Sequence, residues 1–245
     1  MFKKTTLENG LRLITIPMDQ ANSVTVLILV GTGSKYETRE QNGISHFLEH
    51  MFFKGTDKRP DTLSLSAELD ALGGEYNAFT SKEYTGYYVK TAAGKLGQAL
   101  EILGDMLSNS KFDAVEIERE KGVIIEELNM YEDNPIMHVE DVLESCLYGD
   151  TPAGRDTIGT KKNIRAFKRS DFLRYFRRQY GAHSISVILS GSIRPVDKAA
   201  AAKIFGIFPI NAWRNKIAVK EKQEQPLLKI VNKKTDQINL ALALR

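Results

Sequence analysis

The chain has 245 residues, of which 42% are hydrophobic and 27% are charged. This length is enough to bury a core as one large domain or two small ones, and the composition excludes wholesale disorder. The 34 basic and 31 acidic residues leave a net charge of +3, which indicates no particular class of partner.

The N-terminal residues contain neither the apolar segment of a secretory signal nor the Arg- and Ser-rich pattern of a transit peptide. The longest uninterrupted apolar stretch near this end, residues 26–30, is far too short to span a bilayer. The single cysteine, Cys146, forms no internal disulfide and fits a small core residue better than a nucleophile. We therefore expect a cytoplasmic protein with no membrane partner.

Apolar spacing and turn residues predict the secondary structure. Asn9-Gly10 is a strong hairpin signal, because both residues tolerate the positive φ angles of a tight turn. Ser170 is a plausible N-cap of a later helix. In chain order, the sequence predicts strands at 11–16 and 23–30, helices at 44–53 and 62–72, strands at 75–80 and 84–90, helices at 94–108, 113–131 and 137–147, a loop at 149–159, a helix at 170–180, a strand at 184–189 and a helix at 195–205.

Strand pairs thus alternate with helix pairs along the chain. This order indicates an α+β fold, with helices packed on one face of a mostly antiparallel sheet. Residues 218–235 are polar without a clear period and are typical of a linker, and residues 237–244 alternate as one last strand. We therefore expect one domain over residues 1–217, followed by a linker and the first strand of a missing second domain over residues 218–245.

The segment His-x-x-Glu-His at 46–50 carries the clearest chemistry. At 3.6 residues per turn His46 and His50 are about 40° apart around a helix axis, so both imidazoles leave the same face, with Glu49 beside it. Two neutral imidazoles and a neighbouring carboxylate are what a catalytic zinc site requires. The alternative is a pair of ordinary histidines on an amphipathic helix.

A third ligand is predicted from the acid-rich helix at 113–131. Glu120 and Glu127 share a face with the apolar residues of this helix, whereas Glu126 points away from it and should face water. A glutamate on the buried side is costly unless it is paired or bound to metal. Glu127 is therefore the predicted ligand, and Glu120 is a candidate to orient a ligand histidine through its other ring nitrogen.

These two segments together resemble the pitrilysin, insulysin and mitochondrial processing peptidase family of inverted-motif zinc peptidases. The interval from His50 to Glu127 and the Glu118-Arg-Glu120 helix match the family pattern. The resemblance implies one Zn²⁺ per chain, with His46, His50 and Glu127 as ligands. It also implies Glu49 as the general base, Glu120 as a supporting acid, and the family's two similar halves closing around a chamber.

The resemblance also implies a substrate-binding edge strand at 73–80, in which Asn77, Ala78 and Phe79 would bind substrate. An exposed edge offers unpaired backbone groups to an extended peptide, although such a strand read alone is an ordinary hairpin strand. The family places further substrate-binding residues in a second half beyond this chain. A second half-domain or subunit, in a homo- or hetero-oligomer, is therefore an expected partner.

The predicted function is a zinc metalloendopeptidase that hydrolyses peptides or short unfolded segments, in which Glu49 activates a zinc-bound water that attacks the scissile carbonyl. The alternative is a zinc-containing but non-catalytic partner or scaffold subunit of a two-half peptidase. A nucleic-acid binder would rest only on the eight basic residues within 161–178, which are more typical of a solvated helix surface, so no nucleic-acid partner is expected. His138 and His183 have no neighbouring histidine and are not predicted ligands.

Overall fold

The structure is a computed structural model that describes residues 1–211, 215–220, 223–234 and 236–243. Its centre is a six-stranded sheet with the strand order β1-β2-β6-β3-β5-β4. The strands are β1 (Lys3–Thr6), β2 (Arg12–Pro17), β3 (Ser23–Val30), β4 (Glu75–Thr80), β5 (Thr85–Ala92) and β6 (Ile185–Gly191). Only β2 and β6 pair in parallel, so the sheet is mixed but mostly antiparallel.

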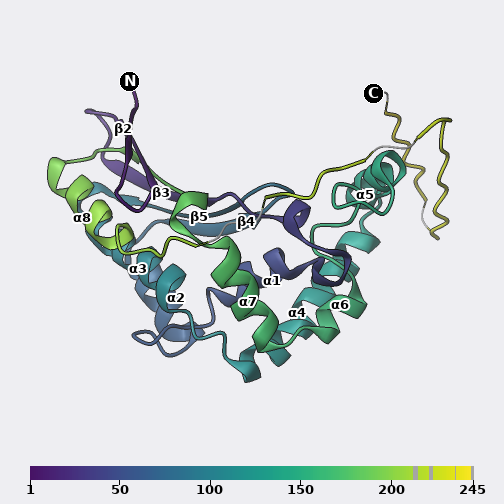
Figure 1. Cartoon of the computed structure of the whole chain (residues 1–245), viewed down its shortest axis with the longest axis horizontal. Helices are drawn as coiled ribbons and strands as arrows, with labels where there is room; N and C mark the ends of the chain where they lie inside the picture. The colour runs from purple at the N-terminus through teal and green to yellow at the C-terminus, as the bar shows by residue number, and fades with distance from the viewer. Residues whose placement is uncertain (212–214, 221–222, 235, 244–245) are drawn as a thin grey trace.

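Helices cover one side of this sheet (Figure 1). The α-helices of the described residues are α1 (Ile44–Met51), α2 (Thr62–Ala71), α3 (Leu96–Asn109), α4 (Ala114–Asp133), α5 (Pro135–Tyr148), α6 (Lys161–Ala166), α7 (Arg169–Gln179) and α8 (Pro195–Phe205). The predicted α+β class is confirmed. None of these helices is both long enough and apolar enough to cross a membrane.

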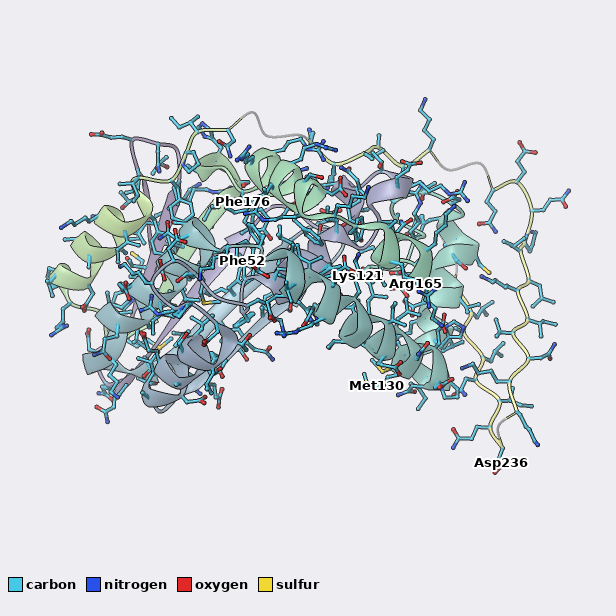
Figure 2. All side chains as sticks on the ribbon, turned by 90° about the horizontal axis from the view of Figure 1, so that it is seen from below. Phe52, Lys121, Met130, Arg165, Phe176 and Asp236 are labelled. Atoms are coloured by element: carbon cyan, nitrogen blue, oxygen red, sulfur yellow. The ribbon has the colours of Figure 1, made fainter. Side chains whose placement is uncertain are left out.

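The core lies between the sheet and the helices. Along β3 every second side chain is buried, which is the alternation of a strand with one face on the core. Helix α1 fits into this core through aromatic contacts, with the Phe47 ring 4.8 Å from the Phe172 ring of α7. Just after α1, Phe52 packs against Phe176, labelled with it in Figure 2, at 5.8 Å between ring centroids. The helix with the paired histidines is therefore held inside the fold.

The N-terminal hairpin forms, but its turn differs from the prediction. Gly10 has the positive φ, 86°, whereas Asn9 does not take a positive φ. The Asn9 side chain is buried and its amide donates to the backbone carbonyls of Phe205, Gly206 and Phe208. Asn9 thus serves a tertiary contact with the end of α8, which local turn propensity does not reveal.

Two helix predictions near residue 165 were incomplete. Helix α6 was missed, because its six residues are too few to show the helical period of apolar side chains. Its N-cap Thr160 accepts a hydrogen bond from the backbone N–H of Asn163. Helix α7 begins at Arg169 rather than after Ser170, so Ser170 is not its N-cap. The Asp171 carboxylate accepts from the backbone N–H of Lys168, and a carboxylate is a stronger acceptor than a hydroxyl.

The C-terminal tail contains no regular structure in the described residues beyond Phe205. Residues 237–243 form no strand, and the remaining position of the predicted strand, Leu244, lies outside the described residues, as do parts of the predicted linker. A strand requires a neighbouring strand for its backbone hydrogen bonds, and none lies beside residues 237–243. The boundary of a second half-domain stays a prediction.

Candidate metal centre and active site

The start of α1 is fixed by a buried carboxylate. Glu37 is fully buried and accepts hydrogen bonds from the backbone N–H groups of Gly43 at 2.9 Å and Ser45 at 2.8 Å. Gly43 has a φ of 99°, and a Cβ there would lie 2.5 Å from the Ile158 carbonyl oxygen, so only glycine fits. The first turn of the helix that carries the paired histidines is thereby set in one position.

Three side chains converge between α1 and α4. The rings of His46 and His50 have centroids 4.7 Å apart, and both face Glu127 of α4. His46 Nε2 lies 3.6 Å from Glu127 Oε1, and His50 Nε2 lies 3.4 Å from Glu127 Oε2. The helix phase predicted from the sequence therefore brings Glu127, and not the exposed Glu126, to the histidines.

These donor atoms fit a zinc ion. One ligand atom from each of His46, His50 and Glu127 lies within 4.8 Å of the others, and no other such group of acidic, histidine or cysteine side chains occurs among the described residues. Two ligands bound at about 2.0 to 2.1 Å in a tetrahedral site lie roughly 3.4 Å apart. The separations of 3.4 and 3.6 Å are close to that value. Two imidazoles and one carboxylate also leave a fourth position open.

The charged side chains around the two histidines shift one another's pKa values. Burial lowers the pKa of His50, but Glu120 and Glu127 outweigh it and raise the pKa to about 9. The imidazoles of His46 and His50 lower the pKa of Glu127 to about 2. The buried Glu120 accepts from His50 Nδ1 at 2.9 Å, because an ionised carboxylate has no proton to donate. Nε2 of His50 is thus left to face Glu127, which is the ring orientation that a metal ligand needs.

Glu49 lies beside the histidines and is held from the sheet. The Thr80 hydroxyl, at the end of β4, donates to Glu49 Oε2 at 2.5 Å. Burial raises the pKa of Glu49, and the hydrogen bond from Thr80 opposes that rise. Sequence reasoning identified Glu49 but missed Thr80, because nothing in the sequence indicates which residue of the strand faces α1.

A cavity of about 480 Å³ opens in front of these groups, bounded by α1, β4, α4 and α5. Ala78 and Phe79 line it, whereas Asn77 does not, and the side chain of Asn77 instead accepts from the backbone N–H of Ala78. Four further acids contribute to the wall: Glu140, Asp141, Glu144 and Asp156. Strand β4 is the last strand of the sheet, so one of its edges has no neighbouring strand in the described part of the chain.

Comparison with known proteins identifies the family. The family model described as Insulinase (Peptidase family M16) matches residues 12–161. The chain belongs to peptidase family M16. It is 37% identical to the uncharacterized zinc protease YmxG of Bacillus subtilis over 246 residues, covering 100% of this chain and 59% of that protein. It is 40% identical to the mitochondrial-processing peptidase subunit beta of Bos taurus over 189 residues, covering 77% of this chain and 38% of that subunit.

Solved structures share the M16 fold. The inactive domain of an M16 peptidase from Pseudomonas fluorescens superimposes with a TM-score of 0.81 at 17% identity, covering 89% of this chain and 53% of that one. At this identity the likeness concerns the fold alone, and the fold therefore does not decide activity. The chain spans little more than half the length of YmxG and less than half that of the bovine subunit.

Other candidate residues of this M16 chain lie outside the centre. Neither His138 nor His183 belongs to the group around Glu127. All but Lys168 of the basic residues of 161–178 fall on α6 and α7, where several contact the chain itself. Arg169 donates to the Phe112 and Lys111 carbonyls, and Lys161 pairs with Glu132 at 2.8 Å. Such contacts favour a structural interpretation of this run, and the expectation of no nucleic-acid partner stays a prediction.

Proposed function

We propose that this chain is the zinc-binding catalytic half of an M16 metalloendopeptidase. One observation carries the proposal: His46, His50 and Glu127 converge on one another, and Glu49 lines the same cavity as His46 and Glu127. A non-catalytic family member would not need a further carboxylate beside these three side chains. The names of the relatives support zinc and proteolysis at the level of the family.

The side chains have separate tasks in this proposal. His46, His50 and Glu127 would hold the zinc, which when bound polarises a carbonyl and makes water more acidic. Glu49 would accept the proton of the attacking water, and its raised pKa makes it a better base than an exposed carboxylate. The bond from Thr80 to one oxygen of Glu49 fixes the carboxylate and leaves its other oxygen for the proton. Glu120 would keep the His50 ring in place.

The cavity walls support a peptide as substrate. The free edge of β4 offers backbone groups to an extended chain, with Ala78 and Phe79 at the cavity. Glu140, Asp141 and Glu144 of α5 line the same cavity, and Lys82 there pairs with Glu144 at 2.7 Å, so acidic side chains are in excess. This concentration of negative charge would favour peptides with basic side chains near the cleaved bond.

A second peptidase half is the proposed partner. The relatives are longer than this chain, and one of them is named as a subunit. A second half would close the cavity, exclude water and hold the peptide against β4, and misplaced substrate alone costs about 100-fold in rate. We therefore expect this chain alone to bind zinc but to cleave peptides poorly. Its location in the cytoplasm stays a prediction.

The alternative is a zinc-containing scaffold subunit without activity. Its support is that an M16 domain described as inactive has the same fold. The presence of Glu49, hydrogen-bonded to Thr80 beside the histidines, favours the enzyme.

The test combines metal analysis with hydrolysis. Protein purified without added metal should contain close to one zinc per chain, and His50→Ala should lose it. Hydrolysis of a peptide library is then measured with the chain alone and with a second M16 half added over a range of concentrations. Activity that appears with the added half supports the enzyme. Full zinc loading with no hydrolysis under either condition would establish the scaffold alternative.

A further inference from the structure

Lys54 makes a contact that neither the sequence motif nor the proposed ligand set includes. It lies in the loop after α1, about one helical turn beyond His50. Its Nζ lies 2.6 Å from Glu120 Oε2, while the other carboxylate oxygen, Oε1, lies 2.9 Å from His50 Nδ1. Lys54, Glu120 and His50 therefore form one continuous chain of contacts that ends at the proposed metal centre.

Each oxygen of the Glu120 carboxylate thus has a different partner. The Glu120 side chain is only 5% exposed, and those of Lys54 and His50 are 20% and 21% exposed. A carboxylate this deeply buried is costly without a cation beside it. Removing the ammonium would leave Oε2 unpaired and free the carboxylate to turn towards solvent, and His50 would lose the partner that fixes its ring.

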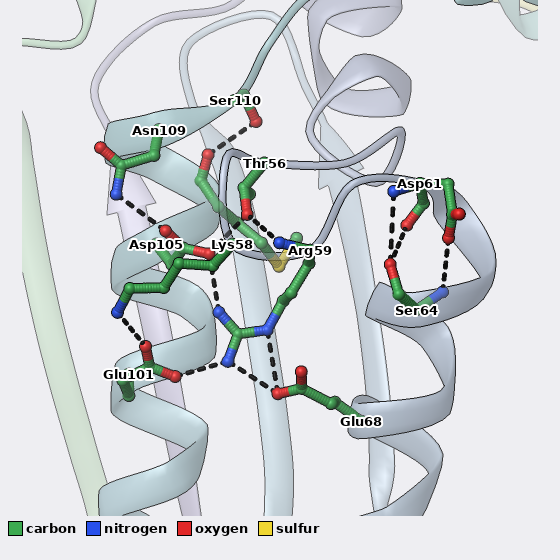
Figure 3. Close-up of polar contacts among 11 residues, drawn as sticks. Thr56, Lys58, Arg59, Asp61, Ser64, Glu68, Glu101, Asp105, Asn109 and Ser110 are labelled. Atoms are coloured by element: carbon green, nitrogen blue, oxygen red, sulfur yellow. Dashed lines mark hydrogen bonds and ion pairs between the residues drawn. The ribbon is translucent and has the colours of Figure 1, made fainter.

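The loop that carries Lys54 is itself anchored, as Figure 3 shows. The Arg59 guanidinium donates to Asp105 at 2.6 Å and to Glu68 at 2.7 Å, which ties the loop to α3 and α2. Thr56 of the same loop donates to Asp105 at 2.6 Å. The backbone that carries Lys54 is therefore held on both sides of this residue, by α1 before it and by this cluster after it.

We infer that Lys54 is a positioning residue of the zinc site, which acts by orienting Glu120 and through it the ligand His50. The inference rests on the proposed zinc site, but it assigns a role that the metal ligands and the base do not cover. A buried hydrogen-bond partner of a metal ligand typically contributes 10- to 100-fold to metal affinity. Because Lys54 acts one contact further away, its loss should fall at the lower end of that range.

The test is a zinc titration of the metal-free chain against a competing chromogenic chelator. Lys54→Met should weaken zinc binding by about tenfold, and Lys54→Gln, which keeps a donor without the charge, should weaken it less. The matched control is Lys58→Met in the same loop, because Lys58 pairs with Glu101 and does not contact Glu120. Zinc affinity of the control should stay within about twofold. Circular dichroism of each metal-free variant verifies that it is folded.

A double-mutant cycle separates positioning from general loosening of the fold. In a Glu120→Gln background, Lys54→Met should have almost no further effect on zinc affinity, because its route to His50 is already gone. An equal loss in both backgrounds would overturn the inference. So would wild-type zinc affinity in Lys54→Met and Lys54→Gln. Failure of the wild-type chain to take up zinc would overturn the proposed function and this inference together, so the two failures are distinguishable.

Discussion

The two walls of the candidate active site are built differently. On one side α1 and α4 bring together the proposed ligands, and each contributes side chains to the core. On the other side α5 has no buried residue, although it contributes three acids to the cavity wall. Helix α5 also contacts the C-terminal tail, because Lys229 Nζ of the tail donates to Ser145 Oγ of α5 at 2.9 Å.

In the proposed enzyme, α1 and α4 would bind the metal and carry out the reaction, whereas α5 would contact the substrate. Metal ligands must be held within a fraction of an ångström, and packing with fixed hydrogen bonds achieves this for α1 and α4. A wall that contacts peptides of varied sequence requires negative charge and open space more than a rigid structure. Changes on α1 and α4 should therefore have large effects on metal and rate, and changes on α5 small effects on peptide affinity.

The largest effect is expected at Glu49. Glu49→Gln removes the proposed base while keeping the size of the side chain, so hydrolysis by the assembled peptidase should fall by about 100- to 10,000-fold. Zinc content should stay unchanged, because Glu49 is not among the three convergent donors. Initial rates and elemental analysis measure the two quantities. A variant that retains more than a tenth of the rate would show that another group is the base.

The next effect concerns α4. Glu127→Gln replaces the proposed carboxylate ligand by a weakly coordinating amide, so zinc affinity should fall by at least about 100-fold, more than for loss of an outer partner. Glu126→Gln is the matched control, because Glu126 is exposed and should leave zinc affinity unchanged. Competition with a chelator measures both constants. Loss of zinc in the control alone would show that Glu126, and not Glu127, is the ligand.

The third effect is on folding stability, at the cluster that anchors the loop after α1. The Arg59 and Asp105 side chains are only 6% and 2% exposed. Arg59→Met leaves Asp105 without its cation, which should lower the free energy of unfolding by about 3 to 5 kcal/mol. The exposed neighbour Lys58 is the control, and Lys58→Met should leave the free energy of unfolding almost unchanged. Urea unfolding followed by circular dichroism measures the stability of both variants. Equal unfolding midpoints for Arg59→Met and Lys58→Met would show that the cluster does not anchor the loop.

Much of the wall formed by α1 and α4 was predictable from the sequence. The spacing of His46, His50 and the apolar residues of α4 follows the helical period, and that period alone separates Glu127 from Glu126. Local periodicity likewise predicted five of the six strands, whereas β1 was indicated only by the hairpin signal at Asn9-Gly10. These features depend on residues close together in the chain, where geometry follows directly from the element type.

Several other contacts between distant segments were not predictable. Thr80 reaches Glu49 only because β4 ends beside α1, and Lys54 reaches Glu120 only because α1 stops at Met51 and the chain then turns. The burial of Asn9 against the end of α8 is of the same kind. Each depends on how elements pack, and a single sequence has no periodic signal for that.

The smallest effect is expected on the α5 wall, at the half-buried Asp141. Burial raises the pKa of Asp141 to about 6, and the negative charges of Asp156, Glu144 and Glu140 add to that rise while Lys82 opposes it. Asp141 is thus neutral well below pH 6 and negative above it. The affinity for a peptide with an arginine near the cleaved bond should therefore increase as the pH rises from 5 to 7. One partly solvated charge pair contributes up to about 1 kcal/mol, so the gain should be about two- to fivefold.

Binding rather than turnover is the proper measurement, because the titration of Glu49 would also change the rate. The Glu49→Gln protein and a fluorescent peptide give dissociation constants across this pH range, with a citrulline peptide of the same length as the neutral control. In an added Asp141→Asn background the gain for the arginine peptide should disappear, because the asparagine side chain does not titrate. If the gain persists there, the charge that peptides sense is not that of Asp141, and the role assigned to this residue of α5 fails.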